Sequence, residues 1–356
     1  MSATDTEFRI NVGPINGLRS VCRYLSRPLS EFSSEFTKGR MLEIIWDLSN
    51  VQPRHMSMAG LTAFLAIAHR VRQFTGHAQK TQCRWDPQVF GFWDDVAFFN
   101  ISDRYQLLDW PDGMLGGYKR GATNPNTKIL VFDYEEAPSA SDINNWRTWK
   151  DKKREEILHI LLDRCGKILR HDFEHAGFSD RARDAVVLTT AELALNSILH
   201  GQATAFAGIQ RTKHGITVSV CDCGLGFART VRRKVATRIT DIQALVLGSL
   251  LNSRELGLRR AIDTLLQHGG YVSMSSSVAD LRWESALWTK AKNWLQSTPF
   301  SSEEMPTPDV IEALGPPSRD FWESKNKGGY WVNEFGVRGS RISFELPFQP
   351  NRNRQL

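Results

Sequence analysis

The sequence predicts an α/β protein made of two units that are joined by a turn-rich connection. The chain has 356 residues, which is enough for two domains of about 100 to 200 residues each. Apolar and β-branched runs alternate along it with segments of helical periodicity. Residues 111–127 are rich in glycine and turn-forming residues, which suits a connection between the units.

The N-terminal unit, residues 1–115, is expected to be a small α/β domain. Its predicted elements are strands at residues 8–12 and 42–48 and helices at residues 18–32 and 60–74. Gly76 is expected to end the second helix. The aromatic-rich stretch at residues 85–110 is interpreted as core, and any exposed part of it would indicate a partner surface.

The connection is placed at residues 116–140 and contains a further predicted strand at residues 128–134. The second unit is placed at residues 141–350, with an insertion at about 277–338 and a tail at 351–356. It is expected to begin with a long helix from Asp142 to Arg170, for which Ser141 is a candidate N-cap. The polar stretch from His171 to His175 is interpreted as a turn between helices. Metal binding and a phosphoacceptor role are weaker alternatives.

A predicted helix in the second unit carries the first candidate site residues. Glu192, Asn196 and His200 are four residues apart, so they form one polar row on a regular helix. A second, apolar face is expected to pack on a sheet, and Gly201 is expected to end the helix. This face consists of Leu188, Ala191, Leu195 and Ile198. A carboxylate, an amide and an imidazole suit a site for Mg²⁺ and a nucleotide; a solvated face is the alternative.

A second stretch follows this helix and makes a site the stronger interpretation. Residues 216–221 alternate in β-forming residues and end at Asp222. Gly224 and Gly226 then allow a turn with positive φ and a close approach to the backbone.

The order of these motifs resembles the GHKL superfamily of ATP-binding proteins. Glu-x-x-x-Asn-x-x-x-His is followed by Asp-x-Gly-x-Gly and then by a glycine that opens a helix, here Gly257. The Gly-Gly turn at residues 269–270 and the strand at residues 339–347 resemble the third box and the closing strand. The resemblance implies an α/β sandwich of the Bergerat type.

The resemblance also implies a role for each matched residue. Asn196 would coordinate Mg²⁺, Asp222 would accept a hydrogen bond from the adenine amino group, and Gly257 would bring phosphates to a helix N-terminus. Glu192 is the implied general base. His200, Gly224, Gly226 and Ser340 complete the implied ATP site, with Ser340 in the place of a family threonine. The sequence departs from the family at Glu255, whose carboxylate would repel phosphate.

The N-terminal unit resembles a STAS domain over about 40 residues. The resemblance consists of a strand that closes on residues 47–51, a loop, and a helix that starts near Gly60. Ala59 stands where that family has its phosphorylated serine, and Ser57 lies two residues earlier. A phosphorylation switch is therefore not predicted here.

Three functions follow from the GHKL resemblance. The leading one is a regulatory protein that binds ATP with Mg²⁺ and hydrolyses it slowly, coupled to rearrangement of a partner or of the N-terminal unit. The alternatives are a serine/threonine protein kinase like the anti-sigma factors and a nucleotide-binding module without catalysis. A protein partner or a homodimer is expected in each case. The sequence has no Walker A motif.

Composition and charge restrict the remaining classes. The net charge of +6 permits contact with nucleic acid, yet no nucleic-acid motif is present. The densest basic run, residues 229–238, is interpreted as a solvated nucleotide lid. The five scattered cysteines predict buried thiols and no disulfide framework. No apolar run approaches the length of a membrane span, and residues 1–9 do not resemble a signal peptide. We therefore expect a cytoplasmic protein without a membrane partner.

Overall fold

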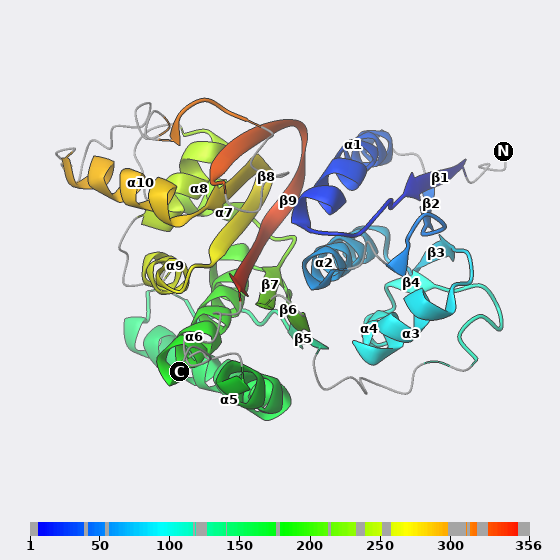
Figure 1. Ribbon diagram of the computed structural model, residues 1–356. Helices are drawn as coiled ribbons and strands as arrows, with labels where there is room; N and C mark the ends of the chain where they lie inside the picture. The colour runs from blue at the N-terminus through cyan, green and yellow to red at the C-terminus, as the bar shows by residue number, and fades with distance from the viewer. Residues whose placement is uncertain are drawn as a thin grey trace.

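A computed structural model shows two sheets with helices between and beside them (Figure 1). The residues that the structure describes are 6–38, 42–53, 57–116, 118, 127–139, 141–175, 179–212, 215–232, 239–250, 258–297, 311, 314–318 and 327–347. The predicted α/β class is confirmed.

The first sheet has four strands, all parallel, in the order β1-β2-β3-β4. Its strands are β1 (Thr6–Asn11), β2 (Leu42–Asp47), β3 (Gln79–Gln82) and β4 (Leu108–Asp109). Its connections contain α1 (Leu18–Thr37), α2 (Met58–Thr75), α3 (Pro87–Asp95) and α4 (Phe98–Arg104). Each predicted strand and helix of this unit is therefore present. Gly76 caps α2 in the left-handed conformation, with φ of 82°, as predicted.

The helices pack on one face of this sheet, and aromatic side chains fill the space between. Trp46 of β2 meets Phe64 of α2 edge-on, with ring centroids 5.3 Å apart, and Phe64 stacks on Phe98 of α4 at 6.3 Å. All three rings are fully buried. The interpretation of the aromatic stretch as core is thus correct, although Trp85 at its edge is 48% exposed.

The second sheet has five antiparallel strands in the order β5-β6-β7-β9-β8. They are β5 (Thr127–Phe132), β6 (Ala205–Thr212), β7 (Gly215–Cys221), β8 (Tyr271–Trp283) and β9 (Gly329–Pro347). Strand β5 lies in the range that we assigned to the connection. It pairs with β6 along its whole length and therefore belongs to the second sheet.

Helices cover both faces of the second sheet, as Figure 1 shows. One face packs on α1 and α2, which therefore lie between the two sheets. The other face and its edges carry α5 (Ile143–His175), α6 (Asp180–Asn196), the π-helical turn η2 (Ser197–Gly201), α7 (Gly226–Arg232), α8 (Asp241–Leu250), α9 (Leu258–Gln267) and α10 (Ser285–Ser297).

The two faces differ in character because side chains alternate along each strand. On β7, Val218 and Val220 join the apolar core on the α6 side. Ser219 and Cys221 point the other way, toward α2, and are completely buried. The hydroxyl groups of Ser219 and Thr62 are 2.9 Å apart across this contact. The sequence of β7 alternates between apolar and small polar residues, as in a strand with one face in solvent, yet both faces of β7 are buried.

Several predicted details of the second unit differ from the structure. Leu188 is 51% exposed and does not belong to the buried face of α6, because Val186 and Val187 turn inward instead. Helix α5 continues through His175, so the stretch from His171 is not a turn. Its N-terminal cap is Asp142, whose carboxylate accepts from the Asn145 N–H at 3.1 Å.

The described residues of the predicted insertion continue β8, form α10 and supply part of β9. Strand β8 extends to Trp283, and α10 starts at Ser285. Trp283 is fully buried and donates its indole N–H to Ser249 of α8 at 3.1 Å. Trp288 of α10 donates to Asp263 of α9 at 2.7 Å. The end of β8 and α10 therefore pack on the second unit, whereas Phe335 and Val337 of β9 contact α1 and the core that it shares with α2.

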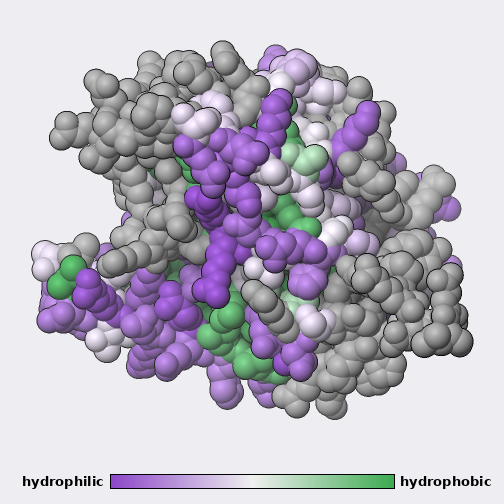
Figure 2. Space-filling view, turned by 60° about the vertical axis from the view of Figure 1, so that its left-hand side comes forward, coloured by the Kyte–Doolittle hydropathy of each residue, from purple (hydrophilic) through white to green (hydrophobic). Residues whose placement is uncertain are grey.

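Figure 2 shows a face of the molecule on which hydrophilic residues dominate the described part, with small hydrophobic patches between them. Among the residues that the structure describes, no helix is long and apolar enough to cross a membrane.

Candidate functional site

Asp222 is the centre of the candidate site, and the alternation of β7 explains its position. The side chains of Val218 and Val220 face the α6 side of the sheet, and Asp222 follows at the same spacing of two. Its carboxylate therefore emerges beside the end of α6, where it is only 1% exposed. Cys221 and Cys223, on either side of it, belong to the core shared with α1 and α2.

Three donors hold the Asp222 carboxylate. Its Oδ1 accepts from the backbone N–H groups of Gly224 at 2.9 Å and Ser340 at 3.2 Å, and its Oδ2 accepts from the Ser197 hydroxyl at 2.9 Å. Burial raises the pKa of this carboxyl, and the hydrogen bonds from Gly224, Ser197 and Ser340 oppose the rise. An ionised carboxylate offers about four acceptor positions, so one remains for a ligand donor.

Glycines allow the backbone to close around this carboxylate. A Cβ atom at Gly224 would lie 2.0 Å from the carbonyl oxygen of Gly201, so no larger residue fits there without a shift of the backbone. Gly226 has a φ of +75°, which L-residues rarely adopt. Glycine is thus needed at position 224 for a close approach of the backbone and at position 226 for a positive φ, as predicted.

A small cavity lies between the end of α6, the start of α7 and strands β7 and β9. Its lining consists of Leu193, Asn196, Ser197, His200, Gly201, Val220, Asp222, Gly226, Phe227, Thr230, Val231, Leu258, Ser340 and Ile342. The cavity volume is about 40 Å³, whereas small-molecule pockets usually measure about 300 to 1,000 Å³. The described side chains therefore leave space for solvent but not for a purine.

The end of α6 is not a regular α-helix. After Asn196 the chain forms the π-helical turn η2, and Gln202 caps it with a φ of 53°. A π turn is wider than an α turn and often marks a functional site. It presents both Asn196 and His200 to the cavity. Gly201 is the last residue of this turn, as predicted, and Gln202 rather than a glycine takes the left-handed conformation.

Glu192 lies one turn before Asn196 but outside the cavity lining. Its Oε1 accepts from the guanidinium of Arg154, on α5, at 2.6 Å, and both side chains are about a quarter exposed. This ion pair holds the carboxylate toward α5. In this arrangement Glu192 cannot serve as a base toward a ligand in the cavity unless it leaves Arg154.

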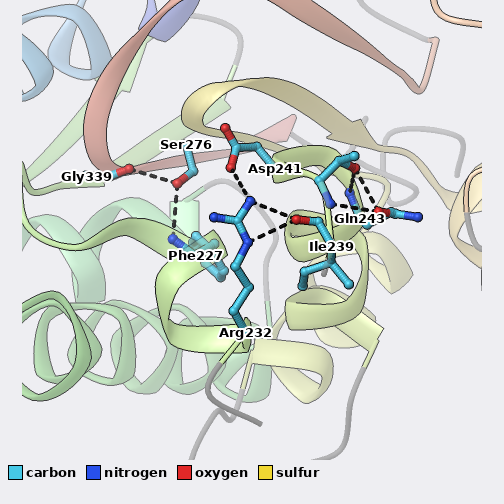
Figure 3. A network of polar contacts seen from close by, with 8 residues as sticks. Phe227, Arg232, Ile239, Asp241, Gln243, Ser276 and Gly339 are labelled. Carbon is cyan, nitrogen blue, oxygen red and sulfur yellow. Dashed lines mark hydrogen bonds and ion pairs between the residues drawn. The ribbon is translucent and has the colours of Figure 1, made fainter. Parts of the chain in front are cut away.

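Helix α7 forms one wall of the cavity and is fixed at both ends (Figure 3). At its start, the Phe227 N–H donates to the Ser276 hydroxyl, which itself donates to the carbonyl of Gly339. At its end, Arg232 donates twice to the Ile239 carbonyl, at 2.9 and 2.7 Å. The two ends of the predicted lid segment are thus held together. Its residues 233–238 lie outside the described part of the chain.

The structure brings together five of the eight predicted site residues. Asn196, His200, Asp222, Gly226 and Ser340 line the same cavity. Gly224 lies just outside the lining and bonds to Asp222. Gly257 and Glu255 lie outside the described residues. The described residues include no group of three or more His, Cys, Asp or Glu side chains that could hold a metal ion.

No protein-family model, curated protein or solved structure matches this chain. The site must therefore be judged on its own geometry.

Sequence reasoning missed Ser197, which donates to the same carboxylate. Its position directly after Asn196 was the only available signal, and on a regular helix it would point about 100° away. Ser340, which stands in the place of a family threonine, contacts Asp222 through its backbone N–H. The side chain at that position is therefore not what holds the carboxylate.

Proposed function

We propose that this chain is an ATP-binding regulatory protein of the GHKL type, with Asp222 as the acceptor for the adenine amino group. The observation that supports this proposal best is the buried, ionisable Asp222, held by three donors in the same cavity as Asn196. A buried acceptor with one open position would favour adenine, which presents an amino donor there, over guanine, which presents a carbonyl oxygen.

The donor set also fits a magnesium nucleotide. Asn196 supplies an amide oxygen, a ligand type that Mg²⁺ accepts together with phosphate oxygens and water. When bound, Mg²⁺ would offset the phosphate charge. The residues of this chain would then orient the base through Asp222 and hold the metal through Asn196, both of which face the cavity.

The cavity must widen before a nucleotide can enter. Its movable wall in this proposal is α7, which contributes Phe227, Thr230 and Val231 to the lining. The helix has seven residues and begins at the left-handed Gly226, where a change in φ and ψ would turn it once the Phe227–Ser276 bond at its start is released. Nucleotide binding would thus displace α7 and, through Arg232, the bonded Ile239.

The pairing of Glu192 with Arg154 favours one alternative, a nucleotide-binding module without catalysis. The two functions differ in what breaking this pair does. Arg154→Gln would free Glu192 and raise ATP turnover in a slow ATPase, and it would leave turnover at background in a binding module. Release of phosphate from labelled ATP measures this, with Arg183→Gln, a surface pair on α6, as the control.

Fluorescence titration with a labelled ATP analogue, with Mg²⁺ or with EDTA, tests the proposed metal role. The wild type should bind more tightly with Mg²⁺, and Asn196→Ala should bind equally in both conditions. The absence of saturable binding in either condition would refute the proposed function.

A further inference from the structure

A second and larger cavity lies on the opposite side of the Asp222 turn, between α1 and α2. Its volume is about 530 Å³, within the usual range of small-molecule sites of about 300 to 1,000 Å³. It is lined by Leu29, Ser30, Phe32, Ser33, Ser34, Thr37, Ile67, Arg70, Val71, Phe74, Cys223, Gly336, Val337 and Arg338. None of the functions considered above uses this cavity.

The floor of the cavity is apolar. Phe32 of α1, Ile67 and Val71 of α2 and Val337 of β9 are all buried. Phe74, at the end of α2, is 46% exposed and extends this surface to the rim. The floor would therefore bind an aliphatic or aromatic group.

One wall of the cavity is a stripe of hydroxyl groups on α1. Ser30, Ser33, Ser34 and Thr37 follow the spacing of three and four residues that puts side chains on one helix face. All four are exposed, so they can donate to a ligand. The acidic neighbours on α1, Glu31 and Glu35, do not line the cavity.

Two arginines from different elements complete the rim. Arg70 of α2 lies over the Phe74 ring at 5.8 Å, and Arg338 of β9 donates to the Gly224 carbonyl at 3.0 Å. Among the described residues that line the cavity there is no Asp or Glu. Partial burial, and then repulsion from Arg70 and Arg229, lowers the pKa of Arg338. The positive charges of Arg70 and Arg338 thus lie close together, and no carboxylate among the described lining residues offsets them.

We propose that this cavity binds a small amphipathic organic anion, with its charged head on Arg70 and Arg338 and its apolar body on the floor between α1 and α2. A phosphate or carboxylate head can accept from both guanidinium groups and from the hydroxyl stripe. The site is independent of the proposed nucleotide site, although both touch the turn at residues 222–224.

Calorimetric titration of the full chain with 1-naphthyl phosphate tests this proposal. One saturable site is expected, with much weaker binding of the uncharged 1-naphthol and of inorganic phosphate, because each carries only one of the two recognised parts. Absence of saturable binding to the wild type, or equal affinity for 1-naphthol, would overturn the proposal.

Variants locate the site. Arg70→Gln and Arg338→Gln should each raise the Kd about tenfold or more, and Ser33→Trp, which fills the cavity from an exposed helix position, should abolish binding. Arg23→Gln, on α1 but outside the lining, should leave the Kd unchanged. Arg338 also bonds to Gly224, so Arg338→Gln can fail to fold. In that case the test rests on Arg70→Gln and Ser33→Trp. Wild-type affinity in these two variants would refute the assignment.

Discussion

Replacing Thr62 by valine is expected to destabilise both units together, because its hydroxyl joins them. Thr62 Oγ1 lies 2.9 Å from the Ser219 hydroxyl of the second sheet and donates within α2 to the Met58 carbonyl at 2.8 Å. Valine keeps the shape of threonine but removes the hydroxyl. Loss of the bond leaves the buried Ser219 hydroxyl without this partner, which costs about 1–3 kcal/mol.

The double variant Thr62→Val with Ser219→Ala separates the bond from other effects. Removing both hydroxyl groups leaves neither member of this bond without its partner, so the double variant should be less destabilised than the sum of the single variants by about 0.5–1.5 kcal/mol; the Cys221 thiol, 3.4 Å from Thr62 Oγ1, loses its contact equally in both variants that carry valine. Urea unfolding followed by tryptophan fluorescence gives each free energy. Thr75→Val, on the same helix but bonded only within its own unit, serves as the control.

The same curves test whether the units unfold as one. A shared buried interface predicts a single transition, whose midpoint Thr62→Val shifts to lower urea. Two separate transitions, or additive free energies in the double variant, would refute the argument that α1 and α2 are packed firmly between the sheets.

Other predictions concern packing, the glycine turn and pH. Trp283→Ala should cost about 3–5 kcal/mol in urea unfolding because the ring is fully buried, whereas Trp85→Ala, 48% exposed, should cost clearly less; equal costs would contradict this. Gly224→Ala, whose Cβ would lie 2.0 Å from a carbonyl oxygen, should lower stability and nucleotide affinity, while Gly91→Ala, with open space around it in a helix, should raise stability by up to about 1 kcal/mol. Since burial raises the pKa of Asp222, the folded protein binds this proton more tightly than the unfolded chain, so ionised Asp222 lowers stability at neutral pH and the cost disappears on acidification. Nucleotide affinity should also fall on acidification, and the fall should begin at a pH above the ordinary carboxyl pKa of about 3.9. A fluorescence titration that gives a constant affinity down to that pH would contradict the role of Asp222 as the acceptor.

The elements were predictable where periodicity and glycine agree. The strand that ends at Asp222, the helix that carries Asn196, and the Gly-Gly turn before Tyr271 all lie where the sequence places them. These patterns arise from local geometry and from burial on a single face, and both can be read from neighbouring residues.

The contact between the units was not predictable in the same way. The second sheet presents small polar residues to α1 and α2, including Ser219, Ser273, Ser275 and Ser343, and all four are buried. In a sequence, such an alternating row is typical of a solvent-facing strand. Only the tertiary packing shows that these small side chains allow two helices to approach the sheet.

The pairing of Glu192 was also beyond the sequence. Its partner, Arg154, is 38 residues away on another helix, and nothing in the spacing of the polar row indicates it. The π turn after Asn196 was missed for a related reason, since it depends on how η2 packs against the strand that carries Asp222.

The proposed adenine pocket is tested most directly by calorimetric titration of ATP with Mg²⁺ into the wild type and Asp222→Asn, with GTP as the control. Asparagine can keep the bonds at this position, since its oxygen can accept from Gly224 and Ser340 and its amide can donate to Ser197. It would, however, turn a donor toward the adenine amino group. Binding of ATP but not of GTP, lost in a folded Asp222→Asn protein, is the predicted result. Equal binding of ATP and GTP, or of ATP by both proteins, would contradict the role of Asp222, and no binding by the wild type would refute the nucleotide site itself.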